Sequence, residues 1–259
     1  MAVEPPKLVP WRAFTEAEHE VWRMLFDNQA QSRAELAVPE FSLGLEALGI
    51  TRQRIPDLDE VNARLSHLTG WKAVSVEGLE DSQSFYAMMA RKEYPIGCFI
   101  REAKDLSYTP APDVFHDLYG HMPFFIDPEY ALFCEEFGKR TCRYLEDPKL
   151  LLEWERLFWF TIEFGLIESD MGRKIFGGGL LSSFSESLYA LSDRPLVYPF
   201  DLNLIRNQDY RVDIFQEVLF LLPNRRAVFD CLDEYEAKLL LSSSNATYAG
   251  DTAHRLLAP

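Results

Sequence analysis

Cysteine is scarce in this chain of 259 residues, which has only four, and no two of them are spaced as CxxC. They are Cys98, Cys134, Cys142 and Cys231, and they lie in mixed or apolar segments. This pattern argues against a disulfide framework and favours reduced thiols in the cytosol.

Signals for export or membrane insertion are also missing. The first six residues contain neither the basic n-region nor the apolar h-region of a secretory signal. The longest apolar runs, such as residues 218–222, are far shorter than the roughly 20 residues that cross a bilayer. We therefore expect a soluble cytoplasmic protein.

Positive charge is in short supply. The chain has 26 Lys and Arg against 41 Asp and Glu, which gives a formal net charge of −15. A protein that binds nucleic acid or anionic membranes needs clustered basic residues, so both partners are excluded from our expectations. We interpret the acidity mostly as a contribution to solubility. The apolar content of 47% is ample for a buried core.

Helix dominates the predicted secondary structure. Residues 1–12 carry three prolines and are expected to be extended or loose. A first helix is predicted from Thr15, where Thr15 and Glu18 form a capping-box pattern. Further helices are predicted over 57–68, 82–91, 127–144, 149–165, 183–191, 213–222 and 224–243, and Asp113 is predicted to cap one that carries His116. Short strands are predicted over 71–77 and 99–101. Without repeats or long linkers, residues 1–259 are expected to form one compact domain.

Histidine is rare too, and two of the five histidines, His116 and His121, lie within six residues of each other. Residues five apart on a straight α-helix point about 140° away from each other, so such a helix cannot direct both at one ion. Gly120 and Pro123 oppose continuation of the helix, and we predict that it ends or bends between the two histidines. That break would let both imidazoles bind one metal.

A third ligand is suggested by Glu163, the single acidic residue in the apolar stretch 157–166. A buried carboxylate is unfavourable unless it is paired or bound to metal. Taken singly, an HxxxxH pattern is more often two ordinary histidines, and a lone buried Glu more often pairs with an Arg. Two histidines and one carboxylate also form catalytic zinc sites, with Asp117 or Glu186 as a candidate general base. The residues alone leave an iron monooxygenase and a zinc hydrolase both open.

Seven segments in order carry a resemblance to a known family. They are residues 54–62, 68–71, 99–101, 108–113, 116–121, 159–166 and 179–184. Over about residues 50 to 200 the chain resembles the tetrahydropterin-dependent aromatic amino acid hydroxylases, most closely the short bacterial phenylalanine 4-hydroxylases.

The resemblance implies a mainly α fold with a few short strands, a basket-like catalytic domain around a mononuclear Fe(II). It implies that His116, His121 and Glu163 bind the iron, and that tetrahydrobiopterin or a related tetrahydropterin acts with O2 as co-substrate. The implied reaction is hydroxylation of an aromatic amino acid, with L-phenylalanine to L-tyrosine as the first choice. Tryptophan hydroxylation and phenylalanine 3-hydroxylation are the alternatives within the family, and a non-catalytic amino-acid or pterin sensor is an alternative outside catalysis.

The resemblance also assigns binding residues. For the amino acid it implies that Arg101 binds the α-carboxylate with support from Asp113, and that Thr109 and Ser182 line that end of the pocket. Trp159 and Phe164 would form aromatic walls. For the pterin it implies contacts from Gly78 and Leu79 through their backbone and ring stacking on Phe85. Without the resemblance, the aromatic residues would be read as core, Arg101 as half of an ion pair and Ser182 as a helix cap.

The chain departs from the commoner family pattern at several positions. Ala111 replaces a glutamate found in many relatives, and Tyr119 and residues 122–125 replace smaller side chains near the predicted metal site. Glu80, Gln83 and Tyr86 differ in the pterin loop. No upstream regulatory domain and no C-terminal heptad helix is apparent, so we expect a monomer without an allosteric amino-acid site.

Overall fold

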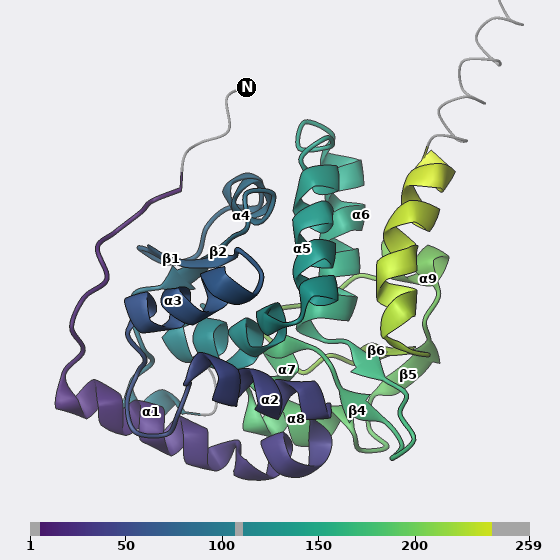
Figure 1. Ribbon diagram of the computed structural model, residues 1–259. Helices are drawn as coiled ribbons and strands as arrows, with labels where there is room; N and C mark the ends of the chain where they lie inside the picture. The colour runs from purple at the N-terminus through teal and green to yellow at the C-terminus, as the bar shows by residue number, and fades with distance from the viewer. Residues whose placement is uncertain (1–5, 107–110, 240–259) are drawn as a thin grey trace, which may run out of the picture.

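The computed structural model describes residues 6–106 and 111–239 (Figure 1). The α-helices are α1 Glu16–Asn28, α2 Pro39–Leu48, α3 Leu58–Leu68, α4 Ser82–Met89, α5 Pro128–Thr141, α6 Pro148–Phe158, α7 Gly178–Leu181, α8 Phe184–Ala190 and α9 Leu202–Asn207. A further helix covers 225–239. The strands are β1 Lys72–Val76, β2 Glu93–Gly97, β3 Leu166–Ile167, β4 Lys174–Ile175, β5 Leu196–Pro199 and β6 Val218–Leu222. The expected fold class, mainly α with a few short strands, is confirmed.

Wider and tighter helical turns complete the fold. The π-helical turns are η1 Ser32–Leu36, η3 His116–His121 and η5 Trp159–Glu163, and the 3₁₀ turns are η2 Ala103–Asp105 and η4 Met122–Ile126. Strands β1 and β2 form a parallel pair in which Lys72 lies opposite Glu93. The second sheet has the order β4-β3-β6-β5.

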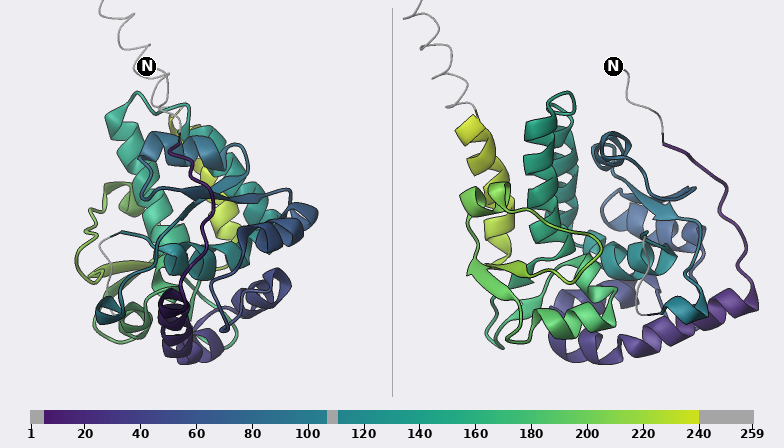
Figure 2. Two further views of the ribbon diagram at one scale, coloured as in Figure 1. Left: turned by 90° about the vertical axis from the view of Figure 1, so that its left-hand side faces the viewer. Right: turned by 180° about the vertical axis from the view of Figure 1, so that it is seen from behind.

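Three long helices stand side by side in both Figure 1 and the rear view of Figure 2: α5, α6 and the helix over 225–239. Arg140 on α5 forms an ion pair with Asp233 at 2.7 Å. The Tyr235 hydroxyl donates to Glu153 on α6 at 2.9 Å. These contacts hold the helix over 225–239 against α5 and α6, and α6 leads directly into the segment that ends at Glu163.

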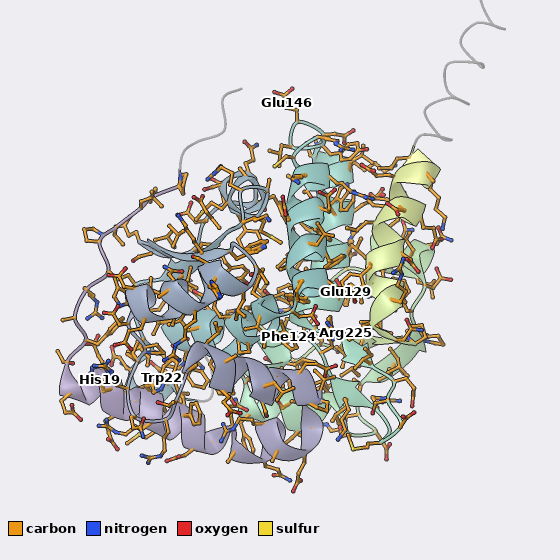
Figure 3. The ribbon with its side chains drawn as sticks, in the orientation of Figure 1. His19, Trp22, Phe124, Glu129, Glu146 and Arg225 are labelled. Carbon is orange, nitrogen blue, oxygen red and sulfur yellow. The ribbon has the colours of Figure 1, made fainter. Side chains whose placement is uncertain are left out.

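Local cap signals in the sequence predict the helix starts well. Thr15 accepts from the backbone N–H of Glu18, and the Glu18 carboxylate accepts in return from the N–H of Thr15, so the predicted capping box is present. Part of the segment expected to be extended or loose pairs with β1: Leu8 forms an isolated antiparallel bridge with Val76, and Val9 donates to the carbonyl of Ser75 at 3.1 Å. On α1, Trp22 is fully buried and its Nε1 donates to the carbonyl of Thr51 at 2.9 Å (Figure 3).

Two predicted elements are wrong. Residues 99–101 are not a strand, because the backbone there bonds elsewhere: the Phe99 carbonyl accepts from Val114, and the Arg101 N–H donates to the Asp113 side chain. The strand lies earlier, at Glu93–Gly97. The helix predicted over 213–222 is also wrong, because Val218–Leu222 pairs with β3 and β5 as a central strand. A short apolar run fits a buried strand and a buried helix equally well.

Two further facts bear on the expectations from composition. No helix in the described part of the chain is long and apolar enough to cross a membrane. All four cysteines are free thiols.

Candidate metal centre and adjoining pocket

The two histidines meet because the helix widens rather than ends. Residues 116–121 form a π-helical turn, in which the hydrogen bond spans five residues, so that residues five apart lie about one turn apart on one face. The predicted end or bend of the helix between the two histidines is therefore wrong, and Gly120 does not have the positive φ of a residue that terminates a helix. Its lack of a side chain serves close packing instead, because a Cβ there would lie 2.5 Å from the carbonyl oxygen of Gly178. Pro123 falls in the first turn of η4, where the helix tightens.

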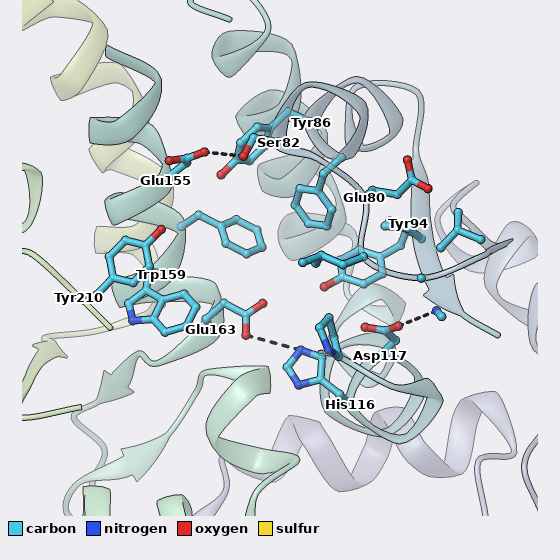
Figure 4. Close-up of a pocket in the computed structure, with 18 residues that line it drawn as sticks. Glu80, Ser82, Tyr86, Tyr94, His116, Asp117, Glu155, Trp159, Glu163 and Tyr210 are labelled. Carbon is cyan, nitrogen blue, oxygen red and sulfur yellow. Dashed lines mark hydrogen bonds and ion pairs between the residues drawn. The ribbon is translucent and has the colours of Figure 1, made fainter. Parts of the chain in front are cut away.

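Glu163 completes a cluster of three donor atoms. Its Oε2 lies 3.7 Å from His116 Nε2, as Figure 4 shows. Its Oε1 lies 3.1 Å from His121 Nε2. The two Nε2 atoms are 3.2 Å apart. Ligands about 2.1 Å from one metal ion and at right angles to each other are about 3.0 Å apart. The three atoms therefore have the spacing of three neighbouring ligands in a metal coordination sphere, which fits the predicted Fe(II) site.

A hydrogen bond behind His116 sets its tautomer. The Ser182 hydroxyl donates to the carbonyl of Gly179 at 2.9 Å, and its oxygen lies 3.0 Å from His116 Nδ1. Since the single hydroxyl proton goes to the carbonyl, Ser182 accepts from Nδ1–H. That arrangement leaves Nε2 with a free lone pair directed at the cluster, as metal-binding histidines require. His121, by contrast, is fully buried, and its Nδ1 has no hydrogen-bond partner among the described residues.

The pKa shifts of His116 and Glu163 favour metal binding. Burial lowers the pKa of His116 to about 4, so its imidazole is neutral at pH 7. Burial alone would raise the pKa of Glu163, but the neighbouring His121 and His116 outweigh it and the net shift is downward. A neutral imidazole and an ionised carboxylate are the protonation states that bind a divalent cation.

Glycines pack directly on two of the three ligands. A Cβ on Gly178 would lie 2.6 Å from His121 Nδ1, and one on Gly179 would lie 2.6 Å from Glu163 Oε2. A Cβ on Gly177 would lie 2.3 Å from the backbone carbonyl oxygen of Glu163. We call residues 177–179 the glycine cradle. It brings α7 against both π-helical turns and confines the positions of the ligand side chains.

Arg101 and Asp113 form a buried ion pair next to η3, the turn that carries His116 and His121. The guanidinium donates through Nε and Nη2 to the two carboxylate oxygens at 2.8 and 2.9 Å. Burial alone would raise the pKa of Asp113, but the Arg101 hydrogen bonds lower it. Asp113 Oδ1 also accepts from the backbone N–H of His116 at 3.0 Å, as predicted for a helix cap. One carboxylate thus orients both the predicted substrate arginine and the first metal ligand.

A pocket opens beside the cluster, with about 860 Å³ of space that is partly open to solvent. Eighteen residues line it, including His116 and Glu163 (Figure 4). The predicted pterin residues Gly78, Leu79 and Phe85 all belong to this lining. The structure therefore brings the predicted cofactor residues and the metal cluster to one cavity.

The other predicted residues lie around this lining. Trp159 lines the pocket, and Phe164 stacks behind it with ring centroids 4.5 Å apart. Ser182 contacts His116 from the side away from the cluster. Thr109 lies outside the described residues.

Several lining residues were not predicted. Tyr94 lies on β2 and stacks on His121 at 5.3 Å, while Tyr210 stacks on Trp159 at 4.4 Å. Glu155 precedes Trp159 by one helical turn, which is the only sequence signal that could have found it. Asp117, considered above as a base for a hydrolase, accepts from the N–H of Gly97 at 2.8 Å, and burial raises its pKa to about 8. It is therefore mostly protonated at neutral pH.

Comparison with known proteins agrees with this geometry. Residues 5–252 match the family described as biopterin-dependent aromatic amino acid hydroxylase. The phenylalanine-4-hydroxylase of Pseudomonas aeruginosa is 38% identical over 221 residues, which cover 85% of this chain and 84% of that protein. That of Chromobacterium violaceum is 38% identical over 247 residues, covering 94% and 83%. The crystal structure of the Chromobacterium violaceum phenylalanine hydroxylase bound to cobalt matches with a TM-score of 0.84 at 37% identity, over 89% of this chain and 83% of that chain.

Proposed function

Since the chain belongs to the biopterin-dependent aromatic amino acid hydroxylases, we propose that it converts L-phenylalanine to L-tyrosine with O2, Fe(II) and a tetrahydropterin. The observation that carries this proposal is the cluster of His116, His121 and Glu163, because two of its members, His116 and Glu163, line the same pocket as Phe85. Tetrahydrobiopterin is the expected cofactor. A monomer in the cytoplasm stays our prediction from the sequence.

The three ligands would hold Fe(II) on one face and leave its remaining positions open. When bound, the iron and the reduced pterin would supply the activation of O2 and the two electrons that the reaction requires. The protein has to hold the ligands in place and exclude water. Ser182 keeps the lone pair of His116 directed at the metal, and the glycine cradle limits the movement of Glu163 and His121.

The substrate would be positioned by its two ends. The Nε and Nη2 atoms of Arg101 donate to Asp113, which leaves Nη1 to donate a hydrogen bond to the α-carboxylate of the amino acid. Trp159, supported by Phe164 and Tyr210, offers a rigid aromatic wall for the ring. Such placement of the ring beside the metal shortens the approach of the reacting atoms.

Two alternatives are less well supported. A zinc hydrolase needs a general base that is free to take a proton beside the metal, and the Asp117 carboxylate instead accepts from the backbone N–H of Gly97 at 2.8 Å. Glu186, whose pKa burial raises to about 7, lies outside the pocket lining in the described structure. Hydroxylation of tryptophan or at the meta position would keep the same residues, and the relatives named phenylalanine-4-hydroxylase favour phenylalanine at the para position.

A product assay tests the proposal. The protein is loaded with Fe(II) without oxygen and then given O2, tetrahydrobiopterin and an equimolar mixture of phenylalanine, tyrosine and tryptophan. We expect para-tyrosine as the main product, lost when iron or pterin is omitted and lost in Glu163→Ala. An exposed carboxylate away from the pocket, in Glu46→Gln, provides the control. Hydroxytryptophan or meta-tyrosine as the main product would contradict the substrate assignment, and activity without pterin would contradict the class.

A further inference from the structure

The pocket has an unusual charge for a cavity that is to hold a soluble cofactor. Its described lining contains the four carboxylates of Glu80, Asp117, Glu155 and Glu163 and no Lys or Arg. Glu163 and Asp117 belong to the metal wall, and their roles are accounted for above. Glu80 and Glu155 have no part in metal or amino-acid binding.

These two glutamates lie at the far side of the pocket from the metal cluster. Figure 4 shows Glu155 on α6 joined to Ser82 on α4, across the cavity from His116 and Glu163. The Glu80 carboxylate accepts from the Ser84 hydroxyl at 2.6 Å and from the backbone N–H of Lys7 at 3.1 Å. Within residues 6–106 and 111–239, both carboxylates are therefore held in place by hydrogen bonds and not by an ion pair.

The aromatic ring of a ligand and its substituent would contact different residues here. Phe85 lies one helical turn after Ser82 on α4, and its ring packs edge-to-face on Phe158 at 5.3 Å. A flat ring held against Phe85 with one edge toward the metal cluster would present a substituent on its opposite edge to the side of the pocket where Ser82 and Glu155 lie. This step rests on the proposed function, which places the reduced pterin against Phe85.

We propose that Glu155, held by Ser82, selects the substituent of the reduced pterin. It accepts hydrogen bonds from a neutral hydroxylated side chain, and together with Glu80 it rejects anionic side chains such as a glutamyl or phosphate tail. A charged acceptor forms the stronger kind of hydrogen bond with a hydroxyl donor. Two carboxylates with no neighbouring cation in the lining disfavour a third negative charge, which makes the selection partly one of repulsion.

A purely structural role for Glu155 makes a different prediction. If the hydrogen bond between Glu155 and Ser82 only holds α6 against α4, removing the Glu155 carboxylate would weaken the binding of every pterin to the same extent, because the whole pocket would be less well ordered. If it selects the substituent, the effect depends on what the pterin carries. Binding measurements with ligands that differ only in that substituent separate the two roles.

The experiment measures dissociation constants by calorimetry on the Fe(II)-loaded protein under nitrogen. The ligands are 7,8-dihydrobiopterin, 6-methyl-7,8-dihydropterin and 7,8-dihydrofolate, which carry a hydroxylated, a methyl and an anionic substituent. The variants are Glu155→Gln and Glu155→Lys, with Glu46→Gln, exposed on α2, as the matched control. Because these ligands are not consumed, the readout does not depend on turnover.

We expect Glu155→Gln to weaken the binding of 7,8-dihydrobiopterin by about tenfold, since a hydrogen bond to a charged group is lost. The dissociation constant of 6-methyl-7,8-dihydropterin should not change. Glu155→Lys is expected to bind 7,8-dihydrofolate at least tenfold more tightly than the unmodified chain does. Equal changes for all three ligands, with unaltered circular dichroism, would overturn the inference and leave the proposed function standing. Failure of the unmodified chain to bind any of the three would overturn both.

Discussion

The glycine cradle offers the sharpest test of how the fold holds the metal ligands. In Gly179→Ala the new Cβ would lie 2.6 Å from Glu163 Oε2, and ordinary van der Waals contact begins at 3.4 Å. The carboxylate would have to retreat by about 0.8 Å, whereas a metal site tolerates about 0.2 Å in its ligand distances. The end of a side chain can move without unfolding the backbone, and the backbone carbonyl oxygen of Glu163, 3.0 Å from the new Cβ, needs to shift by only a few tenths of an ångström. The penalty should therefore appear in metal binding more than in stability.

We expect Gly179→Ala to weaken binding of Co(II), used as a spectroscopic substitute for Fe(II), by about 100-fold, at the upper end of what disturbed supporting residues cause. The accompanying loss of folding stability should be about 1 kcal/mol, at the low end for added volume in a packed site. Titration followed by the visible absorption of Co(II) gives the affinity, and urea unfolding of the metal-free protein gives the stability.

Two matched substitutions separate the effects. In Gly177→Ala the Cβ meets the backbone carbonyl of Glu163 at 2.3 Å, so the main chain must move and stability should fall by about 3 kcal/mol. In Gly78→Ala nothing lies within 4 Å of the new Cβ, and neither metal affinity nor stability should change. Co(II) binding by Gly179→Ala at the level of the unmodified chain would refute the reasoning.

Three other predictions each concern one hydrogen bond or ion pair. Ser182→Ala removes the acceptor that sets the tautomer of His116, so Co(II) affinity should fall about 10- to 100-fold with little change in the urea midpoint; an unchanged affinity would contradict that role. Asp113→Ala leaves a buried guanidinium without its partner and should cost about 3–5 kcal/mol of stability in urea unfolding, far more than the same change at an exposed aspartate. The hydrogen bond from Arg12 lowers the pKa of Glu18 from 4.5 to about 2, so this pair stabilises the fold above pH 4.5 and loses that effect as the pH falls toward 2. Because the pair is partly exposed, Glu18→Gln should lower stability by only about 1 kcal/mol at pH 7, and the difference should shrink at pH 3; a constant difference would assign it to packing.

The sequence determines the helix starts because each depends on a few neighbouring residues. Thr15 and Glu18 cap α1, and Asp113 caps the helical segment that carries His116, as their spacing predicts. Residue types and surroundings also pointed to the three donor residues, because a lone carboxylate in an apolar stretch is costly without a partner, but they fitted an ordinary role about as well as a metal site. Their resemblance to a family then separated iron from zinc, which the residue chemistry left open.

Only the tertiary structure decides how those residues meet. The spacing of His116 and His121 required a departure from a straight α-helix, but a break and a π-helical turn would both satisfy that requirement. The structure has the π-helical turn, and α7 packs closely on its Gly120. Residues 218–222 became a strand because β3 and β5 offer it partners on both sides. Glu155 joined the pocket because α6 packs so that its carboxylate reaches Ser82. Each of these outcomes depends on contacts between segments far apart in the chain, which the local sequence pattern does not decide.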